Sequence, residues 1–185
     1  HPNTALGLFL SALAILWTRE RATGQWRASI AVLLGLAVLL LGLFTLGEYA
    51  FGWNLGIDTI LLPRGAALNA PFPGRSSPQS SFNFALLGVA IVWCNLRWRP
   101  FLTAQIAAIA AAANAILAVT GYVFGAGIFF GFPLNVPTTG MAVQTAIAFI
   151  LLVVAFFCAR PNDGMMTLIV GDTRAGTMAK RILLA

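Results

Sequence analysis

The chain has 185 residues, of which 59% are hydrophobic and only 9% are charged, with a net charge of +6. A soluble globular domain carries about 25% charged residues, so this composition excludes soluble enzymes, nucleic-acid-binding domains and disordered tails. The basic residues stand in short gaps between apolar runs, whereas a nucleic-acid-binding surface gathers them on one face. The sequence therefore predicts an integral membrane protein whose partner is the lipid bilayer, with no nucleic acid.

Long uncharged runs follow one another along the chain. There are 20 uncharged residues between Arg27 and Glu48, 21 between Arg75 and Arg97, and 60 in residues 100–159. A run of 18 or more such residues can form a transmembrane helix. The fold class expected is all-α, a polytopic transmembrane helical bundle with five visible spans and a sixth after the end of the chain. The expected spans are 3–18, 29–51, 79–96, 101–123 and 140–158.

The connections between these spans differ in charge. Nine basic residues lie on one side of the predicted membrane: Arg19, Arg21, Arg27, Arg97, Arg99, Arg160, Arg174, Lys180 and Arg181. Only Arg64 and Arg75 lie on the other side. Because basic connections stay in the cytoplasm, we expect a chain that starts outside and ends inside. Cys94 and Cys158 fall on the cytoplasmic side, where reduced thiols are expected.

Parts of the sequence resemble one another. Residues 2–17 align with 78–93 at an offset of 76, 144–158 follow the same pattern, and EYAFG (48–52) aligns with GYVFG (121–125). Self-similarity at a fixed spacing indicates duplicated units, here a helical hairpin that ends in a YxFG motif. The expected organisation is one membrane domain, 1–185, made of hairpin repeats at about 1–75 and 76–139 and an incomplete third repeat at about 140–185.

An amide and a hydroxyl begin three of the predicted helices. The pairs are Asn3 and Thr4, Gln79 and Ser80, and Gln144 and Thr145. If the hairpins surround a common axis, these pairs lie at equal depth near the outer face and can form a polar pocket for a small ligand. Alternatively, they start helices, with Ser77 or Thr139 as N-cap and Pro2 or Pro78 in the first turn. Hydrogen bonds between helices would then contribute about 1 kcal/mol each.

Two acidic residues near the outer face are further candidates. Glu48 follows a long apolar run, and an intramembrane carboxylate is costly enough to suggest a ligand contact or a proton-linked switch. The aromatic residues after it favour a hydrated carboxylate at the outer interface instead. Asp58 has two structural interpretations: it caps local backbone donors, or it pairs with Arg64 or Arg75.

No catalytic constellation is present in the sequence. There are no paired carboxylates, no CxxC motif and no phosphate-binding loop, so we expect no enzymatic activity in this segment. His1 is the single histidine and therefore predicts no metal site. The alanine-rich stretch 101–123 is expected to be a buried helix, since small residues let helices approach closely, with Gln105 and Asn114 facing other helices.

Several short motifs occur together in one order along most of the chain. They are HPNTALGLFL (1–10), LGIDTILL (55–62), PGRSSP (73–78), TAIAFILLVVAFFCARPNDG (145–164) and AGTMAKRILLA (175–185). This set resembles the bacterial multi-helix membrane sensor region that precedes PAS, GAF, histidine-kinase and diguanylate-cyclase modules. Two departures concern the ligand: PQSSF (78–82) replaces a PNTAL-like start, and AKRILLA (179–185) lacks a final proline.

The resemblance implies a location and a function. It implies a multi-pass protein of the bacterial inner membrane that acts as a non-catalytic sensory input domain, any kinase or cyclase activity lying in a C-terminal module. Other transmembrane helices or a homodimer partner are the expected protein contacts. The alternative is a structural or accessory subunit of a larger membrane complex, of a kind that carries pigments or cofactors, although the sequence identifies no cofactor. A transporter is disfavoured because no midplane charges or broken helices are evident.

Overall fold

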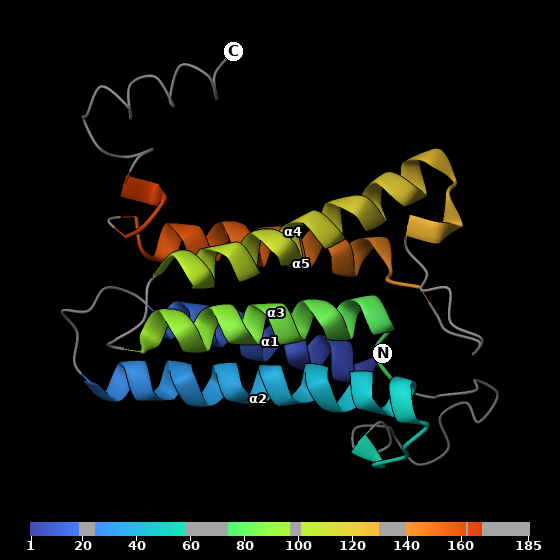
Figure 1. Cartoon of the computed structure of the whole chain (residues 1–185), viewed down its shortest axis with the longest axis horizontal. Helices are drawn as coiled ribbons and strands as arrows, with labels where there is room; N and C mark the ends of the chain where they lie inside the picture. The colour runs from blue at the N-terminus through green and yellow to red at the C-terminus, as the bar shows by residue number, and fades with distance from the viewer. Residues whose placement is uncertain (19–24, 58–73, 97–100, 130–139, 162, 168–185) are drawn as a thin grey trace.

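The computed structural model describes residues 1–18, 25–57, 74–96, 101–129, 140–161 and 163–167. These residues form α-helices and one short 3₁₀ helix, with no β-strand among them. The helices alternate in direction, so α1, α3 and α5 run one way and α2 and α4 the other (Figure 1). The elements are α1 (Pro2–Trp17), α2 (Gln25–Phe51), α3 (Pro78–Asn95), α4 (Phe101–Phe124), η3 (Gly127–Phe129) and α5 (Val143–Ala159). All five expected helices are present, and their ends lie within four residues of the expected ones.

Local sequence sets several helix ends. The Ser77 hydroxyl caps α3 by accepting the Ser80 N–H at 3.2 Å, and Pro78 occupies the first turn, as expected. Gly52 follows α2 and Gly125 follows α4, and both adopt a φ of 67°. This left-handed conformation commonly ends helices, and glycine adopts it at little energetic cost. These are the glycines of the two YxFG motifs.

The start of α5 differs from the expectation. Its N-cap is Ala142, which has no side chain able to cap, so the prediction that Thr139 caps this helix is wrong. Thr139 itself lies outside the described residues.

The central helix of the bundle is α3. Figure 1 shows α3 between α2 and α4, and 13 of its 18 residues are buried. Its first turns carry polar side chains in several directions, among them Gln79, Ser81 and Asn83, so a helix of this composition needs protein contacts on every side.

The prediction of a buried alanine-rich helix is wrong for α4 as a whole. Only 33% of its most apolar stretch is buried. One face, which includes Ala108 and Ala115, packs inside the bundle, whereas Ile106 and Ile116 on other faces are exposed. Alanine gives α4 a flat contact face, but its isoleucines and leucines stay exposed.

Glycines allow α2 and α3 to pack closely. A Cβ placed at Gly42 would lie 2.6 Å from the Ala85 nitrogen and from the Ser81 carbonyl oxygen, and one at Gly88 would lie 2.6 Å from the Leu39 nitrogen. Real Cβ atoms do not approach other atoms this closely. The two backbones are therefore in direct contact, as is common where helices associate in lipid.

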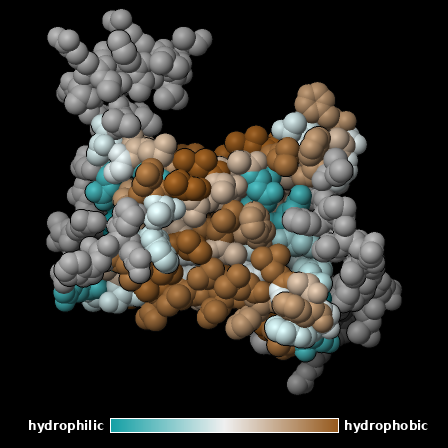
Figure 2. All heavy atoms as spheres, viewed as in Figure 1, coloured by the Kyte–Doolittle hydropathy of each residue, from teal (hydrophilic) through white to brown (hydrophobic). Residues whose placement is uncertain are grey.

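The outside of the bundle is apolar. Figure 2 shows brown, hydrophobic side chains over the middle of one face, with polar side chains toward both ends. By length and composition, α2 and α4 are the two helices among the described residues that could cross a membrane. The helices α1 and α5 are also apolar but have 16 and 17 residues.

Candidate functional site

A cavity of about 280 Å³ lies between the N-terminal ends of α1, α3 and α5. Four hydroxyl-bearing residues line it: Thr4, Ser77, Ser80 and Thr145. Alanine and leucine side chains, including Ala5 and Leu8, form its apolar wall. The exposed His1 also lines the cavity, and no cysteine or acidic residue among those the structure describes does so.

Three of the hydroxyls occupy the same helical position. Thr4, Ser80 and Thr145 are each the third residue of their helix, since the helices start at Pro2, Pro78 and Val143. The side chains of the third residues turn toward the common axis and meet in the cavity. The structure thus brings together one hydroxyl from each of the three amide–hydroxyl pairs.

The amides of these pairs lie elsewhere. The Asn3 amide donates to the Ile57 carbonyl at 3.4 Å, and the Gln79 amide donates to the Phe129 carbonyl at 2.9 Å. Gln144 is exposed, and none of the three lines the cavity. As second residues of their helices, they point about 100° away from the third, toward neighbouring loops.

The cavity hydroxyls differ in their bonding. Thr4 donates to the Ser76 hydroxyl at 3.1 Å, and Ser77 donates to the Ser80 hydroxyl at 2.8 Å. The Thr145 hydroxyl makes no hydrogen bond with any described residue.

Glu48 is paired and buried beside this region. It is 2% exposed, and its Oε2 lies 3.3 Å from Nε of Arg75, which is itself 4% exposed. Its other oxygen accepts the Leu55 N–H at 2.9 Å, and the Arg75 guanidinium lies over the Tyr49 ring, 5.2 Å from its centroid. The expectation of a hydrated Glu48 is therefore wrong, because the loop after α2 and the segment before α3 close over the carboxylate. Asp58 lies outside the described residues.

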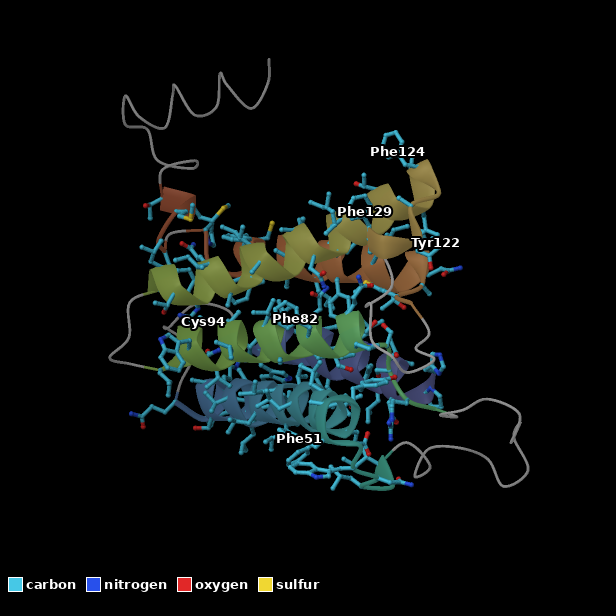
Figure 3. The ribbon with its side chains drawn as sticks, turned by 45° about the vertical axis from the view of Figure 1, so that its right-hand side comes forward. Phe51, Phe82, Cys94, Tyr122, Phe124 and Phe129 are labelled. Atoms are coloured by element: carbon cyan, nitrogen blue, oxygen red, sulfur yellow. The ribbon has the colours of Figure 1, made fainter. Side chains whose placement is uncertain are left out.

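The tyrosines of the two YxFG motifs make equivalent bonds. The Tyr49 hydroxyl donates to the Ser76 carbonyl at 3.0 Å, and the Tyr122 hydroxyl donates to the Met141 carbonyl at 2.8 Å. Each acceptor stands two residues before the start of the next helix, α3 or α5. Figure 3 shows Tyr122 near the start of α5, with Phe124 pointing outward. The internal repeat in the sequence predicts the motif but not the hydrogen bond that its tyrosine makes.

Amides also join α3 to α4. The Asn114 amide donates to Oδ1 of Asn83 at 2.8 Å, so the prediction that Asn114 faces another helix is confirmed. Asn83 Nδ2 and Gln79 Oε1 form no hydrogen bond with other described residues, which leaves this cluster partly satisfied. Gln105 is fully buried and contacts the segment after α5: it donates to the Asp163 carbonyl at 3.3 Å and accepts the Met165 N–H at 2.8 Å.

Arg160 connects the opposite ends of α1, α3 and α5. It is 5% exposed and its guanidinium donates to the Thr18 carbonyl at 3.0 Å, to the Cys94 carbonyl at 2.7 Å and to the Asn95 side-chain oxygen at 3.1 Å. A cation at helix C-termini pairs with carbonyls that lack helical partners and with the negative ends of the helix dipoles. From the sequence, Arg160 is recognisable only as a topology signal, because no local pattern indicates that its guanidinium bonds three acceptors at the ends of distant helices.

Among the residues that the structure describes, no three metal-ligating side chains gather. Comparison with known proteins adds no family: no protein-family model, curated protein or solved structure matches the chain.

Proposed function

We propose that this chain is a membrane-embedded sensory input domain. The helical bundle couples ligand binding at one end to the conformation of the segment that follows α5 at the other end. The apolar exterior supports the membrane location. Of the most apolar stretches of α2 and α4, only 28% and 33% are buried, whereas the core helix of a soluble protein is mostly buried. Leu33 and Leu151, on α2 and α5, are each more than 60% exposed, which favours contact with lipid.

A multi-pass arrangement in the bacterial inner membrane extends this proposal. Because the five helices alternate in direction, each helix carries the chain from one side of the bundle to the other. The basic connections support an orientation with the Arg160 end of the bundle in the cytoplasm and the cavity toward the outside. The equivalent bonds of Tyr49 and Tyr122 support the duplicated hairpin that the sequence predicts.

The observation that carries the sensory function is the placement of two features on the same three helices. The cavity separates the N-terminal ends of α1, α3 and α5, and Arg160 ties their C-terminal ends together. A ligand changes an equilibrium only by binding one of two states better. A ligand in the cavity that moves the N-terminal ends of these helices apart or together would tilt the helices. The tilt would alter the contacts of Arg160, which lies directly before the C-terminal segment.

This coupling can be tested without knowing the ligand. Ala5→Phe partly fills the cavity, and Ala12→Phe places the same ring on an exposed position of α1 away from it. With the full chain in lipid vesicles, hydrogen–deuterium exchange of the 160–167 segment should change in Ala5→Phe and stay as in wild type in Ala12→Phe. Unchanged exchange in both folded variants would contradict the input function.

The second candidate is an accessory subunit of a larger membrane complex. It is favoured by the outer end of α4, which leans away from the other helices and exposes 77% of Phe124 (Figure 1). Such an end could pack against another protein. Reading the coding sequence beyond Ala185 separates the candidates: a further span followed by a PAS, kinase or cyclase module supports the sensor, and a stop codon soon after that span supports the subunit.

A further inference from the structure

Two cavity hydroxyls are kept from the bond that hydroxyls usually make in helices. Serine and threonine in helices commonly donate to the carbonyl four residues earlier. Within the described part of the chain, six hydroxyls do so: Ser11, Thr18, Ser29, Thr45, Ser81 and Thr120. Ser80 and Thr145 do not, and the residue four positions earlier lies two positions before the first residue of the helix in both cases.

The repeated tyrosines occupy the carbonyls in question. For Ser80 the carbonyl four residues earlier is that of Ser76, which accepts the Tyr49 hydroxyl, and for Thr145 it is that of Met141, which accepts the Tyr122 hydroxyl. Each YxFG tyrosine thus bonds the carbonyl that stands four residues before the cavity hydroxyl of the next helix. The hydroxyls are left directed at the shared cavity.

Two hydroxyl hydrogens in the cavity remain available to a ligand. The Ser80 oxygen accepts from Ser77, so its own hydrogen remains to be donated, and the Thr145 hydroxyl has no partner among the described residues. A ligand that accepts a hydrogen bond from both hydroxyls supplies two acceptor lone pairs. A carboxylate accepts from several donors at once, and hydrogen bonds to a charged acceptor are the stronger kind.

The charge of the surroundings also favours an anion. Among the described residues no acidic side chain lines the cavity, and the one buried carboxylate, Glu48, is paired with Arg75. The positive ends of three helix dipoles point toward this space. The wall formed by Ala5 and Leu8 suits a short aliphatic body.

We propose that the cavity binds a small aliphatic monocarboxylate, whose carboxylate accepts hydrogen bonds from Ser80 and Thr145 and whose chain lies against Leu8. This inference rests on the proposed input function and specifies its ligand class. It also gives the YxFG tyrosines a role: they are positioning residues for the cavity hydroxyls.

Equilibrium dialysis of butyrate against the full chain in lipid nanodiscs tests the proposal, with butyramide and 1-butanol as neutral probes of similar size. Butyrate should bind and the neutral probes should bind at least tenfold more weakly. Thr145→Val, which keeps the shape of the side chain, should weaken butyrate binding by roughly ten- to a hundredfold. The matched control is Thr120→Val, whose hydroxyl bonds the Ile116 carbonyl outside the cavity, and it should bind as wild type does.

Three results would overturn the ligand class: no butyrate binding by the folded wild-type chain, equal binding of butyramide or butanol, or equal binding by Thr145→Val. The failures of the two proposals are distinguishable. If Ala5→Phe changes exchange at 160–167 and butyrate does not bind, the carboxylate is wrong and the input function stands. If butyrate binds but neither it nor Ala5→Phe changes that exchange, the input function is wrong.

Discussion

Three charged side chains are buried among the described residues, Glu48, Arg75 and Arg160, and they are stabilised in two different ways. Glu48 and Arg75 neutralise each other. Arg160 donates to two backbone carbonyls and to the Asn95 side chain, and it lies 3.7 Å from the Asp163 carboxylate. Taking a charge out of water costs several kcal/mol, so a buried charge is tolerated only with its partners in place.

Breaking the Glu48–Arg75 pair should therefore cost more than removing both charges. Arg75→Gln leaves Glu48 buried without its cation, and we expect the free energy of unfolding to fall by about 3–5 kcal/mol. The double variant Glu48→Gln/Arg75→Gln should recover much of this loss, because two amides can still bond each other. Unfolding in mild detergent with increasing SDS measures the three proteins. A double variant as unstable as Arg75→Gln would show that the pair's charges are not the reason for the loss.

Arg160 should not be replaceable by lysine. Lys keeps the charge, but a single ammonium group cannot reproduce a planar fork that reaches acceptors on α1 and α3. We expect Arg160→Lys to lower the free energy of unfolding by about 2 kcal/mol, the loss of one or two charged hydrogen bonds. The same SDS titration measures it, and wild-type stability in Arg160→Lys would mean that charge alone holds these helix ends.

The sequence predicted the cavity hydroxyls but not the partners of the buried charges, for a physical reason. It identified Thr4, Ser80 and Thr145, because helix starts and their hydroxyls recur at readable spacing. It could not predict that the hydroxyls and not the amides meet, since a rotation of about 100° per residue separates their directions and depends on how each helix is turned. The Glu48–Arg75 and Arg160 contacts join residues 27 to 142 positions apart, beyond any local pattern.

At the scale of helices, periodicity and capping signals predicted where each helix lies, but not which one is central. Alanine content suggested α4, although α3 holds that place. Polar side chains on α3 need partners, and this need outweighs the close packing that alanine permits. Close contact between α2 and α3 comes instead from single glycines.

Gly42 should consequently be intolerant of a side chain. Gly42→Ala places a Cβ against the α3 backbone, which cannot yield as a flexible side chain can, so the helices must separate. We expect a loss of about 1–3 kcal/mol in the free energy of unfolding. The matched control is Gly47→Ala on the same helix, where the Cβ would meet only the Trp53 ring at 3.6 Å. Alanine there should be neutral or slightly stabilising, and equal losses at both positions would refute the packing explanation.

At the scale of the whole molecule, the proposed function requires that the cavity and Arg160 lie on opposite sides of a membrane. The N-terminal ends of α1, α3 and α5 carry hydroxyls and lie at the same end of the bundle as the Glu48–Arg75 pair, and Arg160 joins their C-terminal ends. An apolar middle separates these two polar ends (Figure 2).

Cysteine accessibility tests this arrangement directly. In a background with Cys94 and Cys158 replaced by alanine, Leu55→Cys marks the end of α2 and Thr167→Cys marks the segment after α5, both exposed positions. Three helices separate them, so five spans place them on opposite sides. A membrane-impermeant maleimide should label Leu55→Cys in intact spheroplasts and Thr167→Cys only in inverted vesicles. Labelling of both from one side would exclude the five-span topology, and with it a cavity facing outward while Arg160 faces the cytoplasm.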